Sequence, residues 1–282
     1  MGILLSQQNN EIISIVHAVI LSAGEGKRLG EITDKIPKSL IKINTLGNKS
    51  ILHYTIDLLL KLGVHRIAIV IGYLGNKIDQ SIDLLKKDNK ILKQTLVLID
   101  ASGQYKFGPL YSFLSITKNE NVFQSQFIYL VIPGDTIFQY DLLREIFALL
   151  SENSQLILKY PLIFYRKIKG MSLKQTTNSE FISLIDLEEV DFQKFLTKIK
   201  KVKLKSIHDS NNMKQIIPIF LFPYSFIQEI INTEKKISAK TIKEVINHLL
   251  KQGTKILAFK VDSDYKFYDI DTKLDLSKVE KI

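Results

Sequence analysis

Short runs of apolar residues alternate along this chain with longer stretches in which apolar residues recur every three or four positions. The short β-branched runs predict buried strands, and the longer stretches predict helices with one apolar face. Strands that alternate with helices are typical of βαβ units. The pattern therefore predicts an α/β fold with a Rossmann-like, mixed and mostly parallel sheet flanked by helices.

The first half of the chain follows this alternation most regularly. We expect strands over residues 15–21, 66–71, 95–99 and 127–132. Helices are predicted over 50–62, with Ser50 as the N-cap and Gly63 just past the end, over 76–87, and from Pro109 onward. This regular order is the basis for the predicted parallel strands.

The second half is less regular and is predicted to be of mixed type. Its expected elements are a helix over 142–150, strands over 155–164 and 181–187 around a polar, mobile segment over 171–180, a strand over 216–222, a helix over 238–251 and a strand over 255–261. No internal repeat or linker divides the chain. We therefore predict a single domain over 15–282, preceded by an N-terminal tail over 1–14.

The composition supports a globular protein and limits the catalytic and metal-binding groups that it can contain. The chain has 282 residues, of which 45% are hydrophobic, and no cysteine. The absence of cysteine excludes disulfides, thiolate metal ligands and a cysteine nucleophile, and it is compatible with a cytoplasmic protein. No apolar run approaches the ~18 to 20 residues that a membrane-spanning helix needs, so we expect no membrane span.

The net charge of +10 favours a polyanionic partner such as a nucleotide, a nucleic acid or a membrane surface. Lysines that are simply solvated explain the same charge. The densest basic run, 198–205, alternates lysine with apolar residues and predicts an amphipathic strand, whereas a nucleic-acid surface would interleave basic residues with exposed aromatics. We therefore expect no nucleic-acid partner, and the sequence leaves the oligomeric state open.

A turn of small residues follows the first predicted strand, in the stretch Leu21-Ser22-Ala23-Gly24-Glu25-Gly26. The dinucleotide-binding fingerprint needs a third glycine three residues after Gly26, where this chain has Leu29. A Walker A loop needs serine or threonine after Gly-Lys, where this chain has Arg28. The turn nevertheless allows successive backbone N–H groups to face one anion.

Two basic residues beside this turn, Arg28 and Lys38, are the candidate catalytic groups. A guanidinium binds phosphate oxygens with a planar fork, and an ammonium supplies a compact charge. Two separate cations on a triphosphate stabilise the charge that develops as the bond between the α- and β-phosphates breaks. The pattern therefore predicts a site where a triphosphate is cleaved and not only bound.

The stretch over 21–40 resembles the signature of the sugar-phosphate nucleotidyltransferases, L-x-A/G-G-x-G-x-R-L followed by a threonine and P-K-x-L. The positions that agree in order and spacing are Leu21, Ala23, Gly24, Gly26, Arg28, Leu29, Thr33, Pro37, Lys38 and Leu40. The resemblance implies a nucleotidyltransferase or GT-A-like fold, with a nucleotide-binding half over about 15–140 and an acceptor-binding half over about 141–282. It also implies that the turn from Leu21 to Gly26 binds the nucleotide.

Three aspartates are the candidate metal ligands. Nucleotidyl transfer uses Mg²⁺, which prefers carboxylate, phosphate and water oxygens. Asp135 follows a buried strand at the carboxyl edge of the predicted sheet, where open α/β folds bind ligands. Asp269 and Asp271 lie two residues apart and share one side of an extended segment. In the family that the chain resembles, a Gly-Asp pair and a later D-x-D-T segment hold the metal, which implies Asp135 and Asp271 first and Asp269 next.

The segment after these aspartates departs from the family pattern. The family often continues D-T-P-E-D-L, whereas this chain has Asp271-Thr272-Lys273-Leu274-Asp275-Leu276. The missing proline and glutamate leave the start of the last helix open. The metal ligands are not affected by this difference.

A second stretch, FGPLYSFLSI over 107–116, resembles the loop-to-helix segment that contacts the nucleoside in this family. Its Tyr111-Ser112 pair is similar to that of cytidylyltransferases that act on phosphocholine or inositol phosphate. Gly108 and Ser112 are therefore candidate nucleotide-binding residues. An ordinary helix start with a packed aromatic side chain explains the stretch equally well.

The resemblance implies a Mg²⁺-dependent nucleotidyltransferase that takes an NTP and a small phosphorylated acceptor, either a sugar phosphate or a polyol or amino-alcohol phosphate. Two alternatives stay open. A GT-A-type glycosyltransferase would use Asp269-Ile270-Asp271 as a D-x-D metal clasp, but it would leave Arg28 and Lys38 unexplained. A catalytically silent relative would bind nucleotide-linked metabolites, but damage to the motif would then be expected. Nothing in the motifs selects one base or one acceptor.

Overall fold

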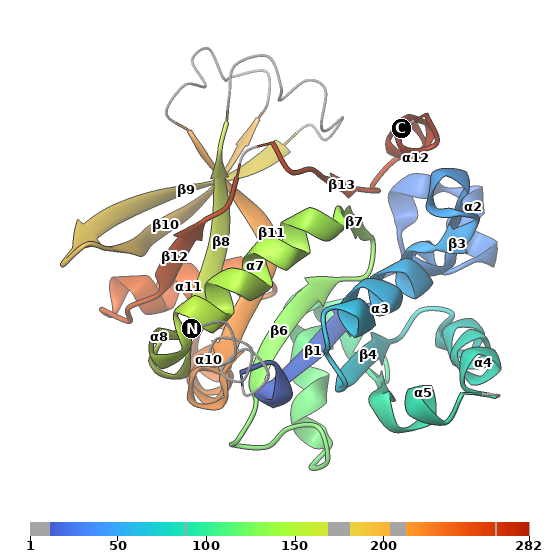
Figure 1. Cartoon of the computed structure of the whole chain (residues 1–282), viewed down its shortest axis with the longest axis horizontal. Helices are drawn as coiled ribbons and strands as arrows, with labels where there is room; N and C mark the ends of the chain where they lie inside the picture. The colour runs from blue at the N-terminus through green and yellow to red at the C-terminus, as the bar shows by residue number, and fades with distance from the viewer. Residues whose placement is uncertain (1–11, 88, 169–180, 204–212, 263, 282) are drawn as a thin grey trace, which may run out of the picture.

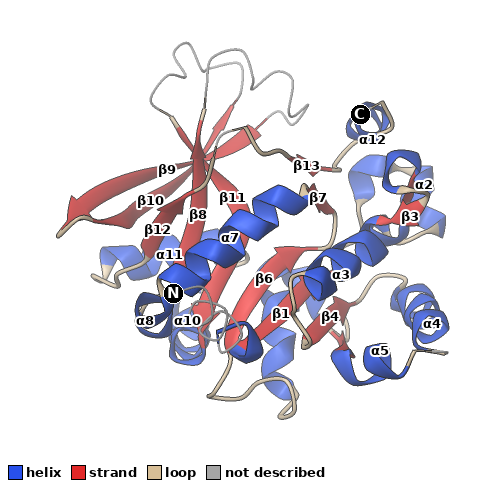
Figure 2. Ribbon diagram, in the orientation of Figure 1, coloured by secondary structure: helices blue, strands red, loops and turns tan. Residues whose placement is uncertain are grey.

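A nine-stranded sheet forms the centre of the molecule in this computed structural model (Figures 1 and 2). The structure describes residues 12–87, 89–168, 181–203, 213–262 and 264–281. In order across the sheet, the strands are β5 (Leu96–Asp100), β4 (Ile67–Ile71), β1 (Val16–Leu21), β6 (Ile128–Pro133), β11 (Lys214–Pro223), β8 (Leu162–Lys167), β12 (Leu257–Lys260), β10 (Gln193–Lys203) and β9 (Phe181–Val190). Two small ladders lie outside the sheet, β13 (Phe267–Asp269) with β7 (Thr136–Phe138) and β2 (Lys42–Ile43) with β3 (Lys49–Ser50).

The sheet has a parallel half and a mixed half. Strands β5, β4, β1 and β6 run in the same direction, as the alternation of elements predicts. Strand β11 is antiparallel to both β6 and β8. Strand β9 pairs with β10 and also with β11, so that β11, β8, β12, β10 and β9 close on themselves.

The prediction of a mostly parallel sheet is wrong for the sheet as a whole. Five of its nine described pairings are antiparallel, namely β6 with β11, β11 with β8, β12 with β10, β10 with β9, and β9 with β11. One reason is local. Val190 pairs with Gln193 across a two-residue turn, Asp191-Phe192, and only antiparallel neighbours can share so short a connection.

Helices cover both faces of the sheet. One face is packed against α3 (Ile51–Lys61), α4 (Gly75–Lys86), α7 (Tyr140–Glu152) and α8 (Ser154–Lys159). The opposite face is packed against α6 (Pro109–Leu114), α10 (Tyr224–Ile237) and α11 (Ile242–Lys251). The remaining short helices are α2 (Glu31–Lys35), α5 (Lys90–Thr95) and α12 (Lys273–Val279). Within the described residues, no helix is both long enough and apolar enough to cross a bilayer.

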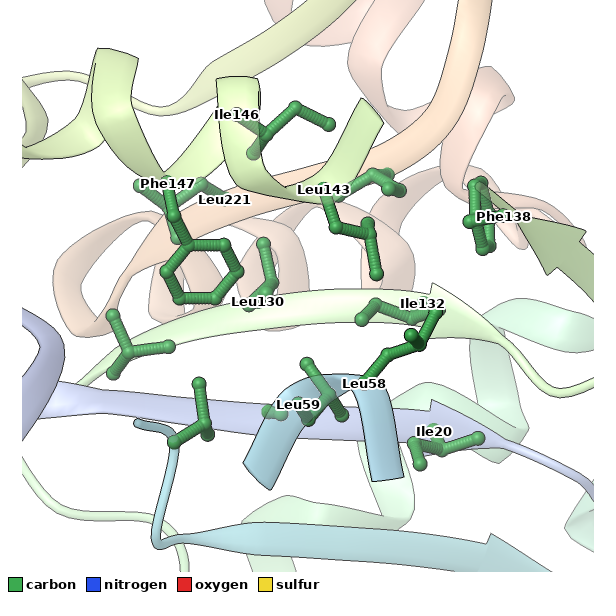
Figure 3. Close-up of a cluster of buried hydrophobic side chains, with 14 of the residues drawn as sticks. Ile20, Leu58, Leu59, Leu130, Ile132, Phe138, Leu143, Ile146, Phe147 and Leu221 are labelled. Carbon is green, nitrogen blue, oxygen red and sulfur yellow. The ribbon is translucent and has the colours of Figure 1, made fainter. Parts of the chain in front are cut away.

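Helix α7 packs across the junction between the two halves of the sheet. Figure 3 shows Leu143 and Phe147 of α7 in one cluster with Leu130 of β6 and Leu221 of β11, and all four side chains are buried. Full burial of a leucine or phenylalanine side chain contributes about 1.5–3 kcal/mol. The apolar face of α7 therefore holds the parallel and mixed halves in one core.

Most of the expected elements are present with small shifts at their ends. The strand expected over 155–164 is wrong in its first part, because Ser154–Lys159 form α8 and the strand β8 starts only at Leu162. Pro161 separates the two elements, and a short apolar run does not distinguish a buried helix from a buried strand. The expected segment 171–180 lies outside the described residues, as does 1–11 of the expected tail, while residues 12–15 are helical.

The expected start of the helix over 238–251 is also wrong. Ser238 has a φ of 50° and ends α10, a helix with no counterpart among the predicted elements. Helix α11 begins after Thr241, whose side chain accepts a hydrogen bond from the Glu244 backbone N–H in a capping box. A residue in the left-handed region cannot continue a helix, so the two helices are separate.

Candidate active site

Strands β1 and β6 end side by side at the carboxyl edge of the sheet. Leu21 pairs with Pro133, and the backbone N–H of Gly134 donates to the Leu21 carbonyl at 2.9 Å. A Cβ on Gly134 would lie 2.2 Å from the Ser22 Oγ and 2.8 Å from the Leu21 oxygen, so only glycine fits there. This close packing brings Asp135 beside the turn that follows β1.

The turn that follows β1 is held by Thr33. Gly26 has a φ of 65°, and a Cβ on it would lie 2.9 Å from the Thr33 Cγ2. The Thr33 hydroxyl lies 3.1 Å from the Gly26 carbonyl oxygen and 3.0 Å from that of Gly30, and it can donate to either. The buried Thr33 of the sequence motif therefore fixes the shape of the turn. The space beside the turn stays open to a ligand.

The ladder of β13 with β7 brings the other two aspartates to Asp135. Asp269 pairs with Thr136, and the Ile270 backbone N–H donates to the Asp135 carbonyl at 3.1 Å. One carboxylate oxygen from each of Asp135, Asp269 and Asp271 lies within 4.8 Å of the others. The three predicted ligands therefore form one cluster, which is compact enough to hold a metal ion.

Both predicted catalytic cations lie against this cluster. The Lys38 Nζ lies 2.7 Å from the Asp135 Oδ2 and 2.9 Å from the Asp271 Oδ1. The Arg28 Nη2 lies 2.7 Å from the same Asp271 oxygen. The Lys38 side chain is 8% exposed and the Arg28 side chain is 66% exposed, so Lys38 is a fixed interior charge while Arg28 lies at the rim.

The buried charges change the proton affinity of two members of this group. Burial disfavours the Lys38 ammonium, but the negative charges of Asp135, Asp269 and Asp271 outweigh it and raise the pKa of Lys38 above its usual value. Asp269 keeps an exposed side, yet desolvation of its carboxyl and the charges of the two neighbouring aspartates raise its pKa to about 8. Lys38 is therefore charged at every physiological pH, and the cluster favours an added cation.

A cavity of about 200 Å³ opens beside these groups. It is lined by the predicted site residues Leu21, Ser22, Gly24, Gly26, Arg28, Lys38, Asp135 and Asp271, and also by Lys27, Ser39 and Gly134. The three additional residues are sequence neighbours of predicted ones, which is the signal that could have identified them. Lys27 is 83% exposed and pairs with Glu25 at 2.7 Å.

The other predicted residues are not among those that line this cavity, namely Ala23, Glu25, Gly108, Ser112 and Asp269. Ala23 is buried, and its carbonyl accepts from the Tyr73 N–H at 3.1 Å. A Cβ on Gly108 would lie 2.4 Å from the Lys240 carbonyl oxygen, and Ser112 is buried in α6. Gly108 is therefore held against the segment between α10 and α11, whereas Ser112 is enclosed within α6.

The chain was compared with known families and proteins. A family model described as nucleotidyl transferase matches residues 17–164. The chain is 39% identical over 62 residues to choline-phosphate cytidylyltransferase of Streptococcus pneumoniae, covering 22% of this chain and 26% of that protein. It is 23% identical over 255 residues to glucose-1-phosphate adenylyltransferase of Fervidobacterium nodosum, covering 86% of this chain and 56% of that protein. The matches thus span little more than half of these curated relatives at most.

Solved structures show the same fold. The crystal structure of UDP-glucose pyrophosphorylase complexed with UDP-glucose matches with a TM-score of 0.69 at 15% identity, over 95% of this chain and 97% of that chain. At this identity the likeness concerns the arrangement of helices and strands.

Proposed function

Because the chain belongs to the nucleotidyl transferase family, whose model matches more than half of its length, we propose that it transfers an NMP group from an NTP to a small phosphorylated acceptor and releases pyrophosphate. The observation that carries this proposal is a set of ion pairs beside the glycine turn, in which Arg28 and Lys38 contact Asp135 and Asp271. A site that only binds a nucleotide does not need two cations and a carboxylate cluster at one point.

Each group has a role that follows from its chemistry. The backbone N–H groups of the turn over 23–26 would bind the triphosphate, since Gly24 and Gly26 carry no side chain that could shield them. The exposed Arg28 would bind the departing β- and γ-phosphates with its planar fork. The buried Lys38 would contact the α-phosphate and the acceptor phosphate as a fixed positive charge.

The proposed reaction is an in-line displacement at the α-phosphorus. A phosphate oxygen of the acceptor forms the new bond, the bond to the bridging oxygen of the β-phosphate breaks, and pyrophosphate leaves with the electron pair. A phosphate monoester has a second pKa of about 6 and is largely ionised near neutral pH. No general base is therefore required, which agrees with the lack of histidine among the described residues that line the cavity.

The aspartate cluster fits Mg²⁺. The Lys38 ammonium already lies between Asp135 and Asp271, so this position accepts a cation in the protein as it stands. We propose that Asp135 and Asp271, with Asp269 beside them, would hold the ion. When bound, Mg²⁺ supplies positive charge to the phosphate oxygens on which negative charge develops.

The base and the acceptor are not selected by these groups. The relatives named above are a cytidylyltransferase, an adenylyltransferase and a UDP-glucose enzyme. We propose an acceptor of the sugar-phosphate or amino-alcohol-phosphate class, and we place the activity in the cytoplasm, where NTPs are made. A glycosyltransferase that uses Asp269 and Asp271 as a clasp would leave the contacts of Arg28 and Lys38 without a function.

A matrix of substrates tests the proposal. The folded protein is incubated with Mg²⁺, each of the four common NTPs and a panel of sugar, polyol and amino-alcohol phosphates, and released pyrophosphate is measured. We expect turnover with at least one pair, and loss of that turnover in Asp135→Ala. Absence of turnover with every pair, or consumption of a nucleotide sugar instead, would contradict the proposal.

A further inference from the structure

Two serine hydroxyls beside the cavity make no hydrogen bond to any described residue. Ser22 and Ser39 are 7% and 3% exposed, and both serines line the cavity with Arg28 and Lys38. A buried hydroxyl without a partner loses its hydration and gains nothing in return, which is a net cost to folding. Folded proteins keep few such groups, and those that persist need an explanation.

The two hydroxyls come from two separate segments of the site. Ser22 directly follows β1 and packs against Gly134, where a Cβ would lie only 2.2 Å from the Ser22 Oγ. Ser39 follows Lys38 in a short 3-10 turn, Lys38–Leu40. Rotation about the single Cα–Cβ bond is enough to change where a serine hydroxyl points. Both side chains can therefore direct their hydroxyls into the cavity without a change in the backbone.

The charges around the cavity indicate what these donors would bind. Lys38 is held between Asp135 and Asp271, and Arg28 also contacts Asp271. A phosphate group offers several charged acceptor oxygens, and hydrogen bonds to charged oxygens are shorter and stronger than those to neutral ones. Neutral hydroxyl donors can serve such oxygens without adding repulsion to the neighbouring cations.

We propose that the Ser39 hydroxyl, together with that of Ser22, donates hydrogen bonds to phosphate oxygens of the bound NTP. This inference rests on the proposed function, since it takes a nucleotide triphosphate as the occupant of the cavity. Position 39 is the unspecified residue of the P-K-x-L motif, so the motif alone assigns Ser39 no role. The unpartnered, buried hydroxyl at the cavity is what distinguishes it.

A ligand-binding hydroxyl and a structural hydroxyl respond differently to removal. Ser39→Ala deletes a group that is unsatisfied in the free protein, so the Tm of the free protein should stay unchanged or rise. Ser50 is the matched control, because it is also 3% exposed but accepts a hydrogen bond from the His53 N–H at 3.2 Å as the N-cap of α3. Ser50→Ala should lower the Tm by about 2 °C and leave phosphate binding unchanged.

The experiment compares full-length wild type, Ser39→Ala, Ser22→Ala and Ser50→Ala. Thermal melts without ligand give the Tm of each protein. Calorimetric titrations with inorganic tripolyphosphate and with ATP, CTP, GTP and UTP, all in MgCl₂, give the Kd values. We expect Ser39→Ala and Ser22→Ala to raise the Kd about tenfold, in line with the loss of one hydrogen bond to a charged group.

The possible results separate this inference from the proposed function. Equal Kd values for wild type and both variants would overturn the inference and leave the proposed function intact. A fall in the Tm of Ser39→Ala as large as that of Ser50→Ala would also overturn it, because the hydroxyl would then be structural. A wild type that binds none of the probes would overturn the proposed function, and this inference with it.

Discussion

Lys38 is a buried cation placed between two members of a carboxylate cluster. Its Nζ contacts Asp135 and Asp271 at 2.7 and 2.9 Å, and its side chain is 8% exposed. A buried ammonium without carboxylates is costly, and so is a set of carboxylates without a cation. The lysine therefore acts as the counter-ion of the cluster in the free protein. A divalent cation held by Asp135 and Asp271 would compete with the ammonium for these oxygens and would displace at least one of the two contacts.

Replacement of this lysine tests both parts of that account. We expect Lys38→Met to lower turnover by about 10²-fold or more, because a fixed charge on the phosphates is lost. We also expect Mn²⁺ or Mg²⁺ to bind the variant more tightly than wild type in the absence of nucleotide, and to raise its Tm further, because the competing cation is gone. Calorimetry and thermal melts measure both effects. The exposed Lys35→Met is the matched control, and weaker metal binding by Lys38→Met would contradict the displacement.

His17 makes stability depend on pH. Its ring is buried beside Phe127 and Tyr129, and neither ring nitrogen has a hydrogen-bond partner among the described residues. Burial, with a smaller effect of the charge on Arg66, lowers the pKa of His17 from 6.5 to about 4. The unfolded chain therefore takes up a proton near pH 6.5 while the folded protein does not.

The sign of this effect follows from the lowered pKa. The contribution of neutral His17 to the free energy of unfolding is fully present above pH 6.5 and is lost as the pH falls toward 4. The loss amounts to about 3 kcal/mol at pH 4. His17→Phe should remove this pH-dependent loss. The curve of its unfolding free energy against pH should therefore be flatter than that of wild type between pH 6.5 and 4. Urea unfolding across this range measures it, with the exposed His65→Gln as control. Parallel curves for His17→Phe and wild type would show that His17 is protonated in the folded protein.

At the scale of elements, the site depends on the short ladder of β7 with β13. This ladder sets Asp269 opposite Thr136, next to Asp135. Arg166 of β8 anchors the segment that leads into β13. Its Nη1 donates to the Tyr265 carbonyl at 2.8 Å, and its guanidinium lies 4.7 Å from the centre of the Phe267 ring. Burial lowers the pKa of Arg166 to about 10, which still leaves it charged at neutral pH. The aspartate cluster is thus tied to the large sheet through β13.

Helix α12 fixes the other end of the same segment. Asp275 accepts from the backbone N–H groups of Asp271 and Thr272, at 3.2 and 2.8 Å, and the Thr272 side chain accepts from the Asp275 N–H. This capping box starts the helix at Lys273, although the proline and glutamate of the family pattern are absent. The start of the last helix, which the sequence left open, is therefore determined by Thr272 and Asp275.

Two capping boxes in the described part of the chain provide a matched pair of variants. Thr272→Ala and Thr241→Ala each remove the cap of one helix, α12 or α11, and each should reduce the free energy of unfolding by about 1 kcal/mol. Only Thr272→Ala should also weaken Mg²⁺ binding, because Thr272 follows Asp271 directly. Urea unfolding and metal titration of both variants measure the two effects. Equal metal affinities would mean that the cap does not position Asp271.

The expected elements were most accurate where local signals were strongest. Helix α3 has a serine N-cap, an apolar face and a glycine after its end, and its observed bounds agree closely with the expected ones. The segment 155–164 has no such signals apart from Pro161, and it contains both α8 and the start of β8. Apolar runs of this length are buried equally well as helix or strand, so only their neighbours in space decide between the two.

At the scale of the molecule, one apolar core joins the two halves. Buried residues of a single cluster come from β1 and α3 in the first half and from α7, β11 and β12 in the second. Strand β6 pairs with β11 on one side and with β1 on the other. Neither half can bury its apolar surface without the other.

We therefore expect the whole chain to unfold in one cooperative transition. Far-UV circular dichroism and tyrosine fluorescence, followed in urea, should give coincident curves, since the protein has 11 tyrosines and no tryptophan. Two separated transitions, or a first half over 1–140 that folds alone, would show that the halves are independent domains.

The sequence by itself determined the order of most elements along the chain and the residue types that make up the candidate site. The glycine turn, Arg28, Lys38 and the three aspartates could be recognised because motif spacing and hydrophobic periodicity depend on neighbours along the chain. Only the tertiary structure decided that Lys38 meets Asp135, 97 positions away, and Asp271, 233 positions away. Only the tertiary structure decided which strands pair in antiparallel fashion and that the hydroxyl of Ser39 is buried without a partner. Pairing direction and burial are set by packing between segments that are remote in the chain.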